Sequence, residues 1–340
     1  MIIKGVSAKA ISDSRGEKTI LVSIKTNTGN FSASSPTGKS TGKYEAKPYK
    51  KSLEEDIKAF NNFSDYFSKE IIEKFDDLRR IEDIVDGHIG ANSLFAFESA
   101  VLKALANEQK KEVWQLINEK AKKLPRLVGN CVGGGKHTSS QRKPDFQEFL
   151  LIPNKNSVAE AFKLNKEIKK RVEMDLKDKD ENFKSRKNDE NAWVTSLNEK
   201  EILEILKNHD VDLGVDVAAS SFYKRKKYHY ENPALKREPE EQMAYLDSLI
   251  KNLGVFCIED PFHEEDFGSF AKLLNKFPDR LIIGDDLIVT DPKRLQKAID
   301  EKSVNAIIVK PNQCGSLLEV KRVCELADKH RIKKVFSQKI

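Results

Sequence analysis

The chain has 340 residues, of which 39% are hydrophobic and 34% charged, with a net charge of +6. This length fits a smaller domain followed by a larger one, and the small basic excess argues against a nucleic-acid-binding protein while permitting an anionic substrate. Four widely spaced cysteines argue against a disulfide framework. No apolar run is long enough to cross a membrane, and the first residues lack the apolar core of a signal peptide. We therefore expect a cytoplasmic protein.

The first part of the chain predicts an α+β domain. Alternating apolar residues over 20–24, followed by a short turn, predict a β-hairpin. Apolar residues then recur at helical spacing over 93–107. Because a basic linker follows at 120–125, we expect one domain over residues 1–126 and a second over 127–340.

In the second part, short β-rich runs alternate with helical patterns, which predicts a parallel sheet flanked by helices. The runs lie at 146–152, 212–217, 255–258, 281–283, 305–309 and 333–337. Two helix starts are recognisable, one at Asp291-Pro292 and one at Ser316, which has Glu319 three positions later. The charged stretch 175–190 predicts a mobile loop.

Four successive β-rich runs end in a charged residue: Asp216, Glu259, Asp285 and Lys310. The active sites of α/β barrels lie at the carboxyl ends of the strands, so these side chains should converge. A single carboxylate there is explained by helix capping, but three on successive strands repel one another unless a cation binds them. Oxygen ligands favour a hard divalent cation such as Mg²⁺.

The motifs around these residues, in this order, resemble those of the enolase family. They are Asp13-Ser14-Arg15-Gly16, the loop 35–46, Gly90-Ala91-Asn92-Ser93, the segment 130–137, Gln147-Glu148-Phe149, the segment 214–223, Glu259-Asp260-Pro261-Phe262, Gly284-Asp285-Asp286-Leu287 and Lys310-Pro311-Asn312-Gln313. The resemblance implies an α/β fold, with an α+β capping domain before a (β/α) barrel. It also implies a lyase that dehydrates 2-phosphoglycerate reversibly to phosphoenolpyruvate in glycolysis, working as a homodimer or larger homo-oligomer.

The resemblance implies a role for eight residues. Asp216, Glu259 and Asp285 would bind Mg²⁺, and Thr37 would help to bind a second Mg²⁺. Lys310 would be the base, Glu190 the general acid and Glu148 its support, and His137 would line the substrate site. Lys339, near the end of the chain, is a further candidate for substrate binding, since it would supply a positive charge without the paired donors of an arginine. The proton next to a carboxylate is weakly acidic because its removal creates a dianion, and enolase-superfamily sites meet this with a lysine or histidine base and Mg²⁺. Cations near Lys310 would lower its pKa and help it to accept the proton.

The chain also departs from the enolase pattern. The glycines of the loop carrying the general acid are replaced over 189–195, and the segment 137–148 is polar and about two residues longer than in the family. After Ser337, the family's phosphate-binding histidine, arginine and serine do not follow, and the last barrel strand with its lysine is missing. We therefore expect an incomplete barrel, either a truncated enolase or a natural short paralogue. An active lyase and an inactive enolase-like protein with a binding or structural role both remain open.

Two further motifs are better explained without a separate function. The segment 33–40 resembles a relaxed Walker A motif, but Gly42 and Pro48 interrupt the helix that a P-loop needs. The basic run 224–227 is flanked by tyrosines, as in some nucleic-acid-binding loops, yet a solvated basic loop is the simpler interpretation.

Overall fold

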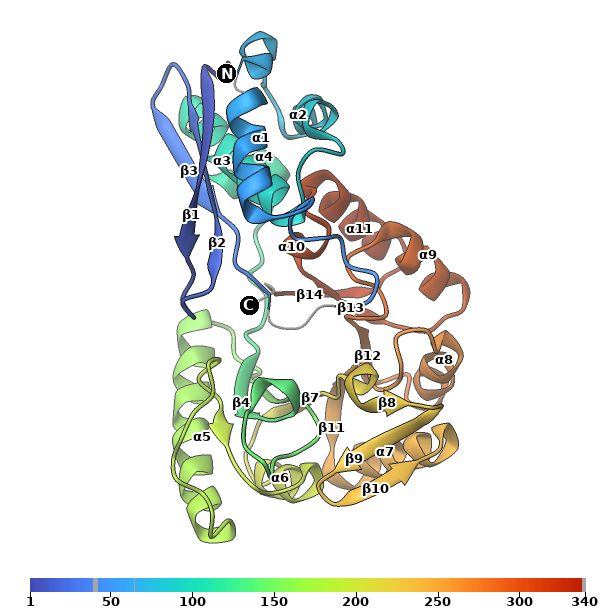
Figure 1. Ribbon diagram of the computed structural model, residues 1–340. Coiled ribbons are helices and arrows are strands. Elements are labelled where there is room, and N and C mark those ends of the chain that lie inside the picture. The colour runs from blue at the N-terminus through green and yellow to red at the C-terminus, as the bar shows by residue number, and fades with distance from the viewer. Residues whose placement is uncertain (39–41, 64, 338–340) are drawn as a thin grey trace.

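A computed structural model describes residues 1–38, 42–63 and 65–337 (Figure 1). The first part of the chain pairs a small sheet with helices that cover it. Its elements are β1 (Gly5–Ser12), β2 (Lys18–Lys25), β3 (Asn30–Ser34), α1 (Leu53–Phe63), the 3₁₀ helices at Tyr66–Lys69 and Phe75–Asp77, α2 (Leu78–Val85), α3 (Ala91–Gln109) and α4 (Val113–Asn118). The antiparallel pairing of β2 with β3 confirms the predicted hairpin, and α3 confirms the helix predicted over 93–107.

Helix α3 is the centre of the first hydrophobic core. Its residues Phe97, Val101 and Leu105 are fully buried against β2, β3 and α1. The helix starts at Gly90, where a Cβ atom would lie 2.3 Å from the Cα of Tyr49, so only glycine allows this approach. Asp56 of α1 accepts hydrogen bonds from the Gly90 N–H at 2.8 Å and from the Ser93 hydroxyl at 2.6 Å, which fixes the helix start.

The second part of the chain forms a curved sheet with helices on its outer side (Figure 1). Its strands are β4 (Gly129–Gly133), β5 (Glu148–Ile152), β6 (Trp193–Val194), β7 (Asp212–Asp216), β11 (Val255–Glu259), β12 (Leu281–Gly284), β13 (Ala306–Val309) and β14 (Lys333–Phe336). Its helices are α5 (Val158–Lys179), α6 (Glu199–Leu206), α7 (Pro239–Leu253), α8 (Phe267–Lys276), α9 (Pro292–Asp300), α10 (Pro311–Cys314) and α11 (Leu317–Lys329), with 3₁₀ turns at Gly135–His137 and Ala219–Phe222. A separate small sheet contains β8 (Tyr223–Lys224), β9 (Lys227–Glu231) and β10 (Ala234–Arg237).

The strand order of the large sheet is β14-β13-β12-β11-β7-β5-β4-β6. Within the described residues no pairing joins β14 to β6 or β4, so the sheet curls without closing, as expected for an incomplete barrel. The expectation of a uniformly parallel sheet is wrong for one strand, because β5 runs antiparallel to both β4 and β7.

Hydrophobic side chains fill the space between the large sheet and its outer helices. A smaller hydrophobic cluster, which includes Cys257, Ile283 and Ile308, lies on the inner side of the strands.

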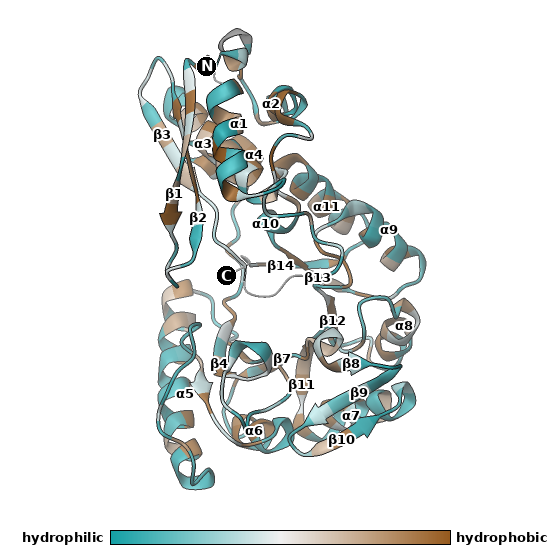
Figure 2. Ribbon diagram, viewed as in Figure 1, coloured by the Kyte–Doolittle hydropathy of each residue, from teal (hydrophilic) through white to brown (hydrophobic). Residues whose placement is uncertain are grey.

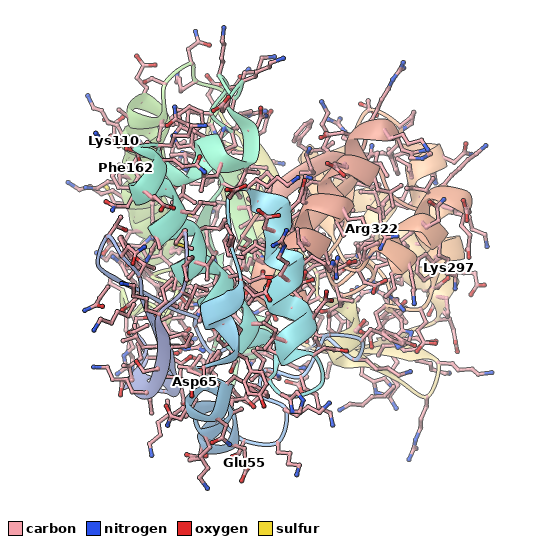
Figure 3. All side chains as sticks on the ribbon, turned by 90° about the horizontal axis from the view of Figure 1, so that it is seen from above. Glu55, Asp65, Lys110, Phe162, Lys297 and Arg322 are labelled. Atoms are coloured by element: carbon pink, nitrogen blue, oxygen red, sulfur yellow. The ribbon has the colours of Figure 1, made fainter. Side chains whose placement is uncertain are left out.

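The outer faces of α5 and α9 are largely hydrophilic (Figure 2). Seen from above, Lys297 of α9 lies toward the edge of the molecule (Figure 3), and the Arg322 side chain of α11 is exposed. No helix in the described part of the chain combines the length and apolar character needed to cross a membrane.

Both predicted helix starts are present. Asp291 accepts a hydrogen bond from the Arg294 N–H at the start of α9, and Ser316 accepts one from the Glu319 N–H at the start of α11. The loop predicted over 175–190 is wrong in its first part, because residues up to Lys179 form the last turn of α5. The charges there suit an exposed helix as well as they suit a loop, so composition did not separate the two.

The two parts of the chain meet where α3 and α2 contact the start of α11. Glu98 of α3 accepts a hydrogen bond from the Leu317 N–H at 2.6 Å, and the Ser316 hydroxyl donates to Glu82 of α2. Gly315 adopts φ = +84°, and a Cβ atom there would lie 2.6 Å from the Cα of Ala91. The contact is therefore close packing of backbone on backbone, with buried carboxyl groups at its centre.

Candidate active site

The charged residues predicted at the strand ends lie at one mouth of the curved sheet. Asp216 ends β7 and Glu259 ends β11, and the two are register partners. Asp285 directly follows β12, and Lys310 directly follows β13. Asp216, Glu259 and Lys310 line a cavity of about 540 Å³, and the ammonium group of Lys310 forms an ion pair with Asp285. The sequence thus located the mouth of the sheet correctly.

The reversed strand β5 explains how Glu148 reaches the same place. Glu148 is the first residue of β5, and in a parallel strand it would lie at the opposite edge of the sheet. Because β5 runs antiparallel to β7, Glu148 is instead the register partner of Asp216. The preceding residue, Gln147, donates a hydrogen bond to Asp216 at 3.0 Å. Gln147 was not predicted as a site residue, although it belongs to the motif that includes Glu148.

His137, Glu148 and Glu190 form a compact group on the wall of the cavity. Nδ1 of His137 lies 2.8 Å from Oε2 of Glu190 and 3.6 Å from Oε1 of Glu148. The side-chain amide of Asn130, on β4, donates to the same Glu190 oxygen at 3.1 Å. The structure therefore brings together three residues that are widely separated in the sequence and adds Asn130, which was not predicted.

The two carboxyl groups of this group differ in pKa. Burial raises the pKa of Glu148 well above its ordinary value, and the nearby charge of Asp216 adds to the effect. Burial also acts to raise the pKa of Glu190, but the hydrogen bond and charge of His137 outweigh it, so this pKa is lowered. Of the two carboxyl groups, Glu148 therefore favours its protonated form more than Glu190 does.

The loop that carries Glu190 keeps a tight turn without the family's glycines. The side-chain oxygen of Asn188 accepts hydrogen bonds from the N–H groups of Glu190 at 3.1 Å and Ala192 at 2.9 Å. Asn191 adopts the left-handed conformation, with φ = +62°, which asparagine tolerates better than most residues. Lys169 of α5 donates to the carbonyl groups of Asn191 and, at 3.4 Å, of Asn130. Hydrogen bonds that involve Asn188 and Lys169 thus hold this loop in a chain that lacks the family's glycines at these positions.

The strand-end carboxyl groups are buried close together, and this shifts their pKa values. Burial and the charge of Asp285 raise the pKa of Asp216 to about 6, and burial with the charge of Asp216 raises that of Glu259 well above its ordinary value. Burial acts to lower the pKa of Lys310, but the charges of Asp285 and Glu259 raise it above its ordinary value. The lowering expected from nearby cations stays a prediction. Buried oxygen donors with unfavourable mutual charge fit a hard divalent cation.

The compact ligand groups differ from the predicted trio. In the described residues, two sets of three side chains have donor atoms within 4.8 Å of one another: His137 with Glu148 and Glu190, and Asp260 with Asp285 and Asp286. Of the predicted metal ligands, only Asp285 belongs to either set. Asp260 accepts hydrogen bonds from the N–H groups of Asp285 at 3.0 Å and Asp286 at 2.7 Å, so it also holds the backbone after β12 in place. Asp260 directly follows Glu259, and Asp286 directly follows Asp285. Their positions next to predicted ligands could have identified them as site residues from the sequence.

Two predicted residues remain, Thr37 and Lys339. The Thr37 hydroxyl donates to the Lys18 carbonyl at 3.1 Å, and the Thr37 carbonyl accepts from Arg15, so the second-metal role of Thr37 stays a prediction. Lys339 lies outside the described residues, as do residues 39–41 of the loop that resembles the family's mobile loop. Arg15 reaches toward this site, with its guanidinium 4.0 Å from Asp189, the neighbour of Glu190.

Comparison with known proteins supports the interpretation of this site. Residues 3–117 match the family model described as enolase, N-terminal domain, and residues 121–339 match the one described as enolase, C-terminal TIM barrel domain. The enolase of Methanosphaera stadtmanae is 33% identical to this chain, in a match that covers 99% of this chain and 87% of the relative. The enolase of Natronomonas pharaonis is 32% identical, in a match that covers 99% of this chain and 88% of the relative. The enolase of Pyrobaculum aerophilum is 40% identical over 64% of this chain, and this match spans about half, 55%, of that relative. The predicted boundary after residue 126 lies close to the junction of the two family models but remains a prediction.

Proposed function

Because the chain belongs to the enolase family, we propose that it is a Mg²⁺-dependent lyase that interconverts 2-phosphoglycerate and phosphoenolpyruvate. The relatives named above are enolases, and this supports an enolase-type lyase. The observation that carries the proposal is the placement of Lys310, which forms an ion pair with Asp285 and lines one cavity with Asp216 and Glu259. We also propose a homo-oligomeric, cytoplasmic enzyme that acts on a small phosphorylated acid.

Lys310 would be the base that removes the proton next to the substrate carboxylate. Asp216, Glu259 and Asp285 would hold Mg²⁺, which would stabilise the developing dianion and, by offsetting the carboxylate charge, lower the pKa of Lys310. Burial of the lysine amine, which favours its neutral form, acts in the same direction. The chain thus supplies a base whose pKa depends strongly on the charge around it.

The pair Glu148 and Glu190 would supply the proton for the departing hydroxyl group. The raised pKa of Glu148 favours its protonated form on this side of the cavity, and Glu190 lies beside it. His137 is hydrogen-bonded to Glu190 and lines the same cavity, where it would contact substrate. This assignment makes Glu148 the holder of the proton, whereas the family resemblance gave that part to Glu190.

The test is formation of phosphoenolpyruvate from 2-phosphoglycerate by the purified chain, with Mg²⁺ and after its removal. Lys310→Ala should lower the turnover number by about 10²- to 10⁴-fold, the range typical of an acid–base residue. Lys293→Ala, which removes an exposed lysine from α9, is the matched control and should leave it unchanged. Turnover that survives Lys310→Ala would refute the proposed role of Lys310, and absence of turnover in the unaltered chain would favour the inactive protein.

A further inference from the structure

A basic cleft lies outside the candidate active site, between two segments in which the chain departs from the enolase pattern. It has a volume of about 600 Å³, and its charged lining residues are Arg142, Lys184 and Arg186. The rest of the lining is uncharged: Ser140, Gln141, Asn182, Val194, Thr195 and Ser196. Among the described residues that line the cleft there is no carboxylate, so three positive charges face one hollow without an acidic partner in its wall.

The cleft is built by the same two segments that carry His137 and Glu190. Arg142 lies in the long polar segment between His137 and β5, and its Nε donates to the side chain of Asn232 at 3.3 Å. Lys184 and Arg186 lie between α5 and β6, and the Arg186 carbonyl accepts from the Val194 N–H at 3.0 Å. A backbone hydrogen bond therefore holds the wall with Arg186, and a side-chain hydrogen bond holds Arg142, while Lys184 and Arg186 are exposed to solvent.

Asp180 is a buried carboxylate that is hydrogen-bonded to residues lining the cleft. Its oxygens accept hydrogen bonds from the Thr195 hydroxyl at 2.5 Å and from the Ser196 N–H at 2.7 Å and hydroxyl at 2.6 Å. The N–H of Asn182 also donates to it, at 2.9 Å. These donors are uncharged, so Asp180 keeps its single negative charge, and the three cations of the lining leave a positive excess at the cleft.

We propose that this cleft binds a small polyanion that carries at least two phosphate groups. Two guanidinium groups offer paired N–H donors that match phosphate oxygens, and a lysine adds a third charge, which together favour an extended anion over a single phosphate. The site is separate from the cavity around Lys310 and does not depend on the lyase activity proposed above. Since the walls of the cleft continue into the loops of His137 and Glu190, an anion bound in the cleft would stabilise both loops.

Isothermal titration calorimetry with pyrophosphate, in low-salt buffer and on protein freed of metal ions beforehand, tests the proposal. The variant Arg142→Gln/Lys184→Gln/Arg186→Gln should bind at least about 10-fold more weakly than the unaltered chain, because the charge-assisted contacts are lost. The matched control is Lys224→Gln/Arg225→Gln/Lys226→Gln, which removes the same net charge from the exposed end of β8 and the turn that follows it. It should change the affinity by less than about twofold.

Three outcomes would overturn the proposal. They are no binding by the unaltered chain, equal weakening in both triple variants, and loss of binding in Lys310→Ala, which would place pyrophosphate in the cavity around Lys310. Retained binding in Lys310→Ala supports a separate site. Because calorimetry requires no turnover, failure of this proposal leaves the proposed lyase activity untouched, and failure of the lyase proposal leaves this one standing.

Discussion

Nδ1 of His137 and Oε2 of Glu190 are 2.8 Å apart, and this contact joins the two loops that form the wall of the candidate active site. The hydrogen bond and charge of His137 outweigh burial and lower the pKa of Glu190. We therefore expect His137→Phe to raise the pKa of Glu190, which can be followed by ¹³C NMR of the glutamate carboxyl groups. His330→Phe, which alters an exposed histidine, is the control. An unchanged Glu190 titration in His137→Phe would show that the contact does not set this pKa.

We expect Lys169 to act as a positioning residue for Glu190. It donates to the carbonyl group of Asn191, the next residue in the chain, and to that of Asn130, whose side chain donates to Glu190. Lys169→Met should lower turnover by about 10- to 100-fold through misplacement of Glu190, while the Michaelis constant changes less. Lys169→Arg should restore part of the activity, since it keeps a charged donor. Lys170→Met, from the exposed neighbouring position on α5, should have no effect. Equal activity in the two methionine variants would contradict the role given to Lys169.

The left-handed conformation of Asn191 predicts which replacements its loop accepts. Asn191→Gly should keep activity, because glycine adopts φ = +62° without a steric penalty. Asn191→Val should cost about 1–3 kcal/mol of local strain and lower turnover, because a β-branched residue disfavours this conformation. Assays of turnover and of the free energy of unfolding check both variants. Similar behaviour of the glycine and valine variants would show that the loop is not held in this conformation.

Magnesium binding should be measurable without catalysis. At a Mg²⁺ concentration 100 times its dissociation constant, binding to the folded state alone stabilises the protein by about 2.7 kcal/mol and raises its melting temperature. Asp216→Asn should lose most of this rise, because Asp216 is a predicted ligand. Asp286→Asn, which alters the neighbouring carboxyl group of the compact set with Asp260 and Asp285, should keep it. The reverse result would move the ion from the predicted trio to that compact set.

Glu98, which is fully buried at the junction with α11, should make stability depend on pH. Burial and repulsion from Glu82 raise its folded-state pKa well above the ordinary value of 4.5. The folded state therefore holds this proton more tightly than the unfolded state, and the resulting stabilisation is complete below pH 4.5 and is lost as the pH rises through the folded-state pKa. Glu98→Gln keeps a neutral acceptor for the Leu317 N–H. In thermal melts recorded across pH, this variant should lose less stability with rising pH than the unaltered chain.

Glu98→Ala serves as the contrasting variant. It leaves the Leu317 N–H without its acceptor and should lower the free energy of unfolding by about 1–3 kcal/mol at low pH, where Glu98 is protonated in the unaltered chain. If Glu98→Gln loses stability with rising pH as steeply as the unaltered chain, another group is responsible for the dependence.

Much of the barrel could be predicted from the sequence because its strands are short apolar runs that end in charged residues. Asp216, Glu259, Asp285 and Lys310 lie at one edge for this reason, and the caps at Asp291 and Ser316 follow from local hydrogen-bonding chemistry. These features depend on neighbours in the sequence, so a pattern of residues is enough to locate them.

Features that depend on distant partners were not predictable in the same way. The direction of β5 is set by its pairing with β4 and β7, and an apolar run carries no information about direction. The loop of Glu190 depends on Lys169 of a helix and on the side chain of Asn188, neither of which resembles the glycines of the family pattern. Thr37 belongs to a matching motif, yet its hydroxyl donates to the Lys18 carbonyl, which only the structure shows.

The contact between Glu98 and Leu317 joins positions 219 residues apart in the chain. At translation rates of about 5–20 residues per second, the ribosome adds the partner of Glu98 roughly 10 to 45 s after Glu98 itself. During this interval α3 can pack on its own sheet, but its face toward the barrel has no cover. A nascent chain of this protein therefore displays a carboxyl group and an apolar surface that the finished protein hides, and a chaperone that binds such surfaces would meet them in that window.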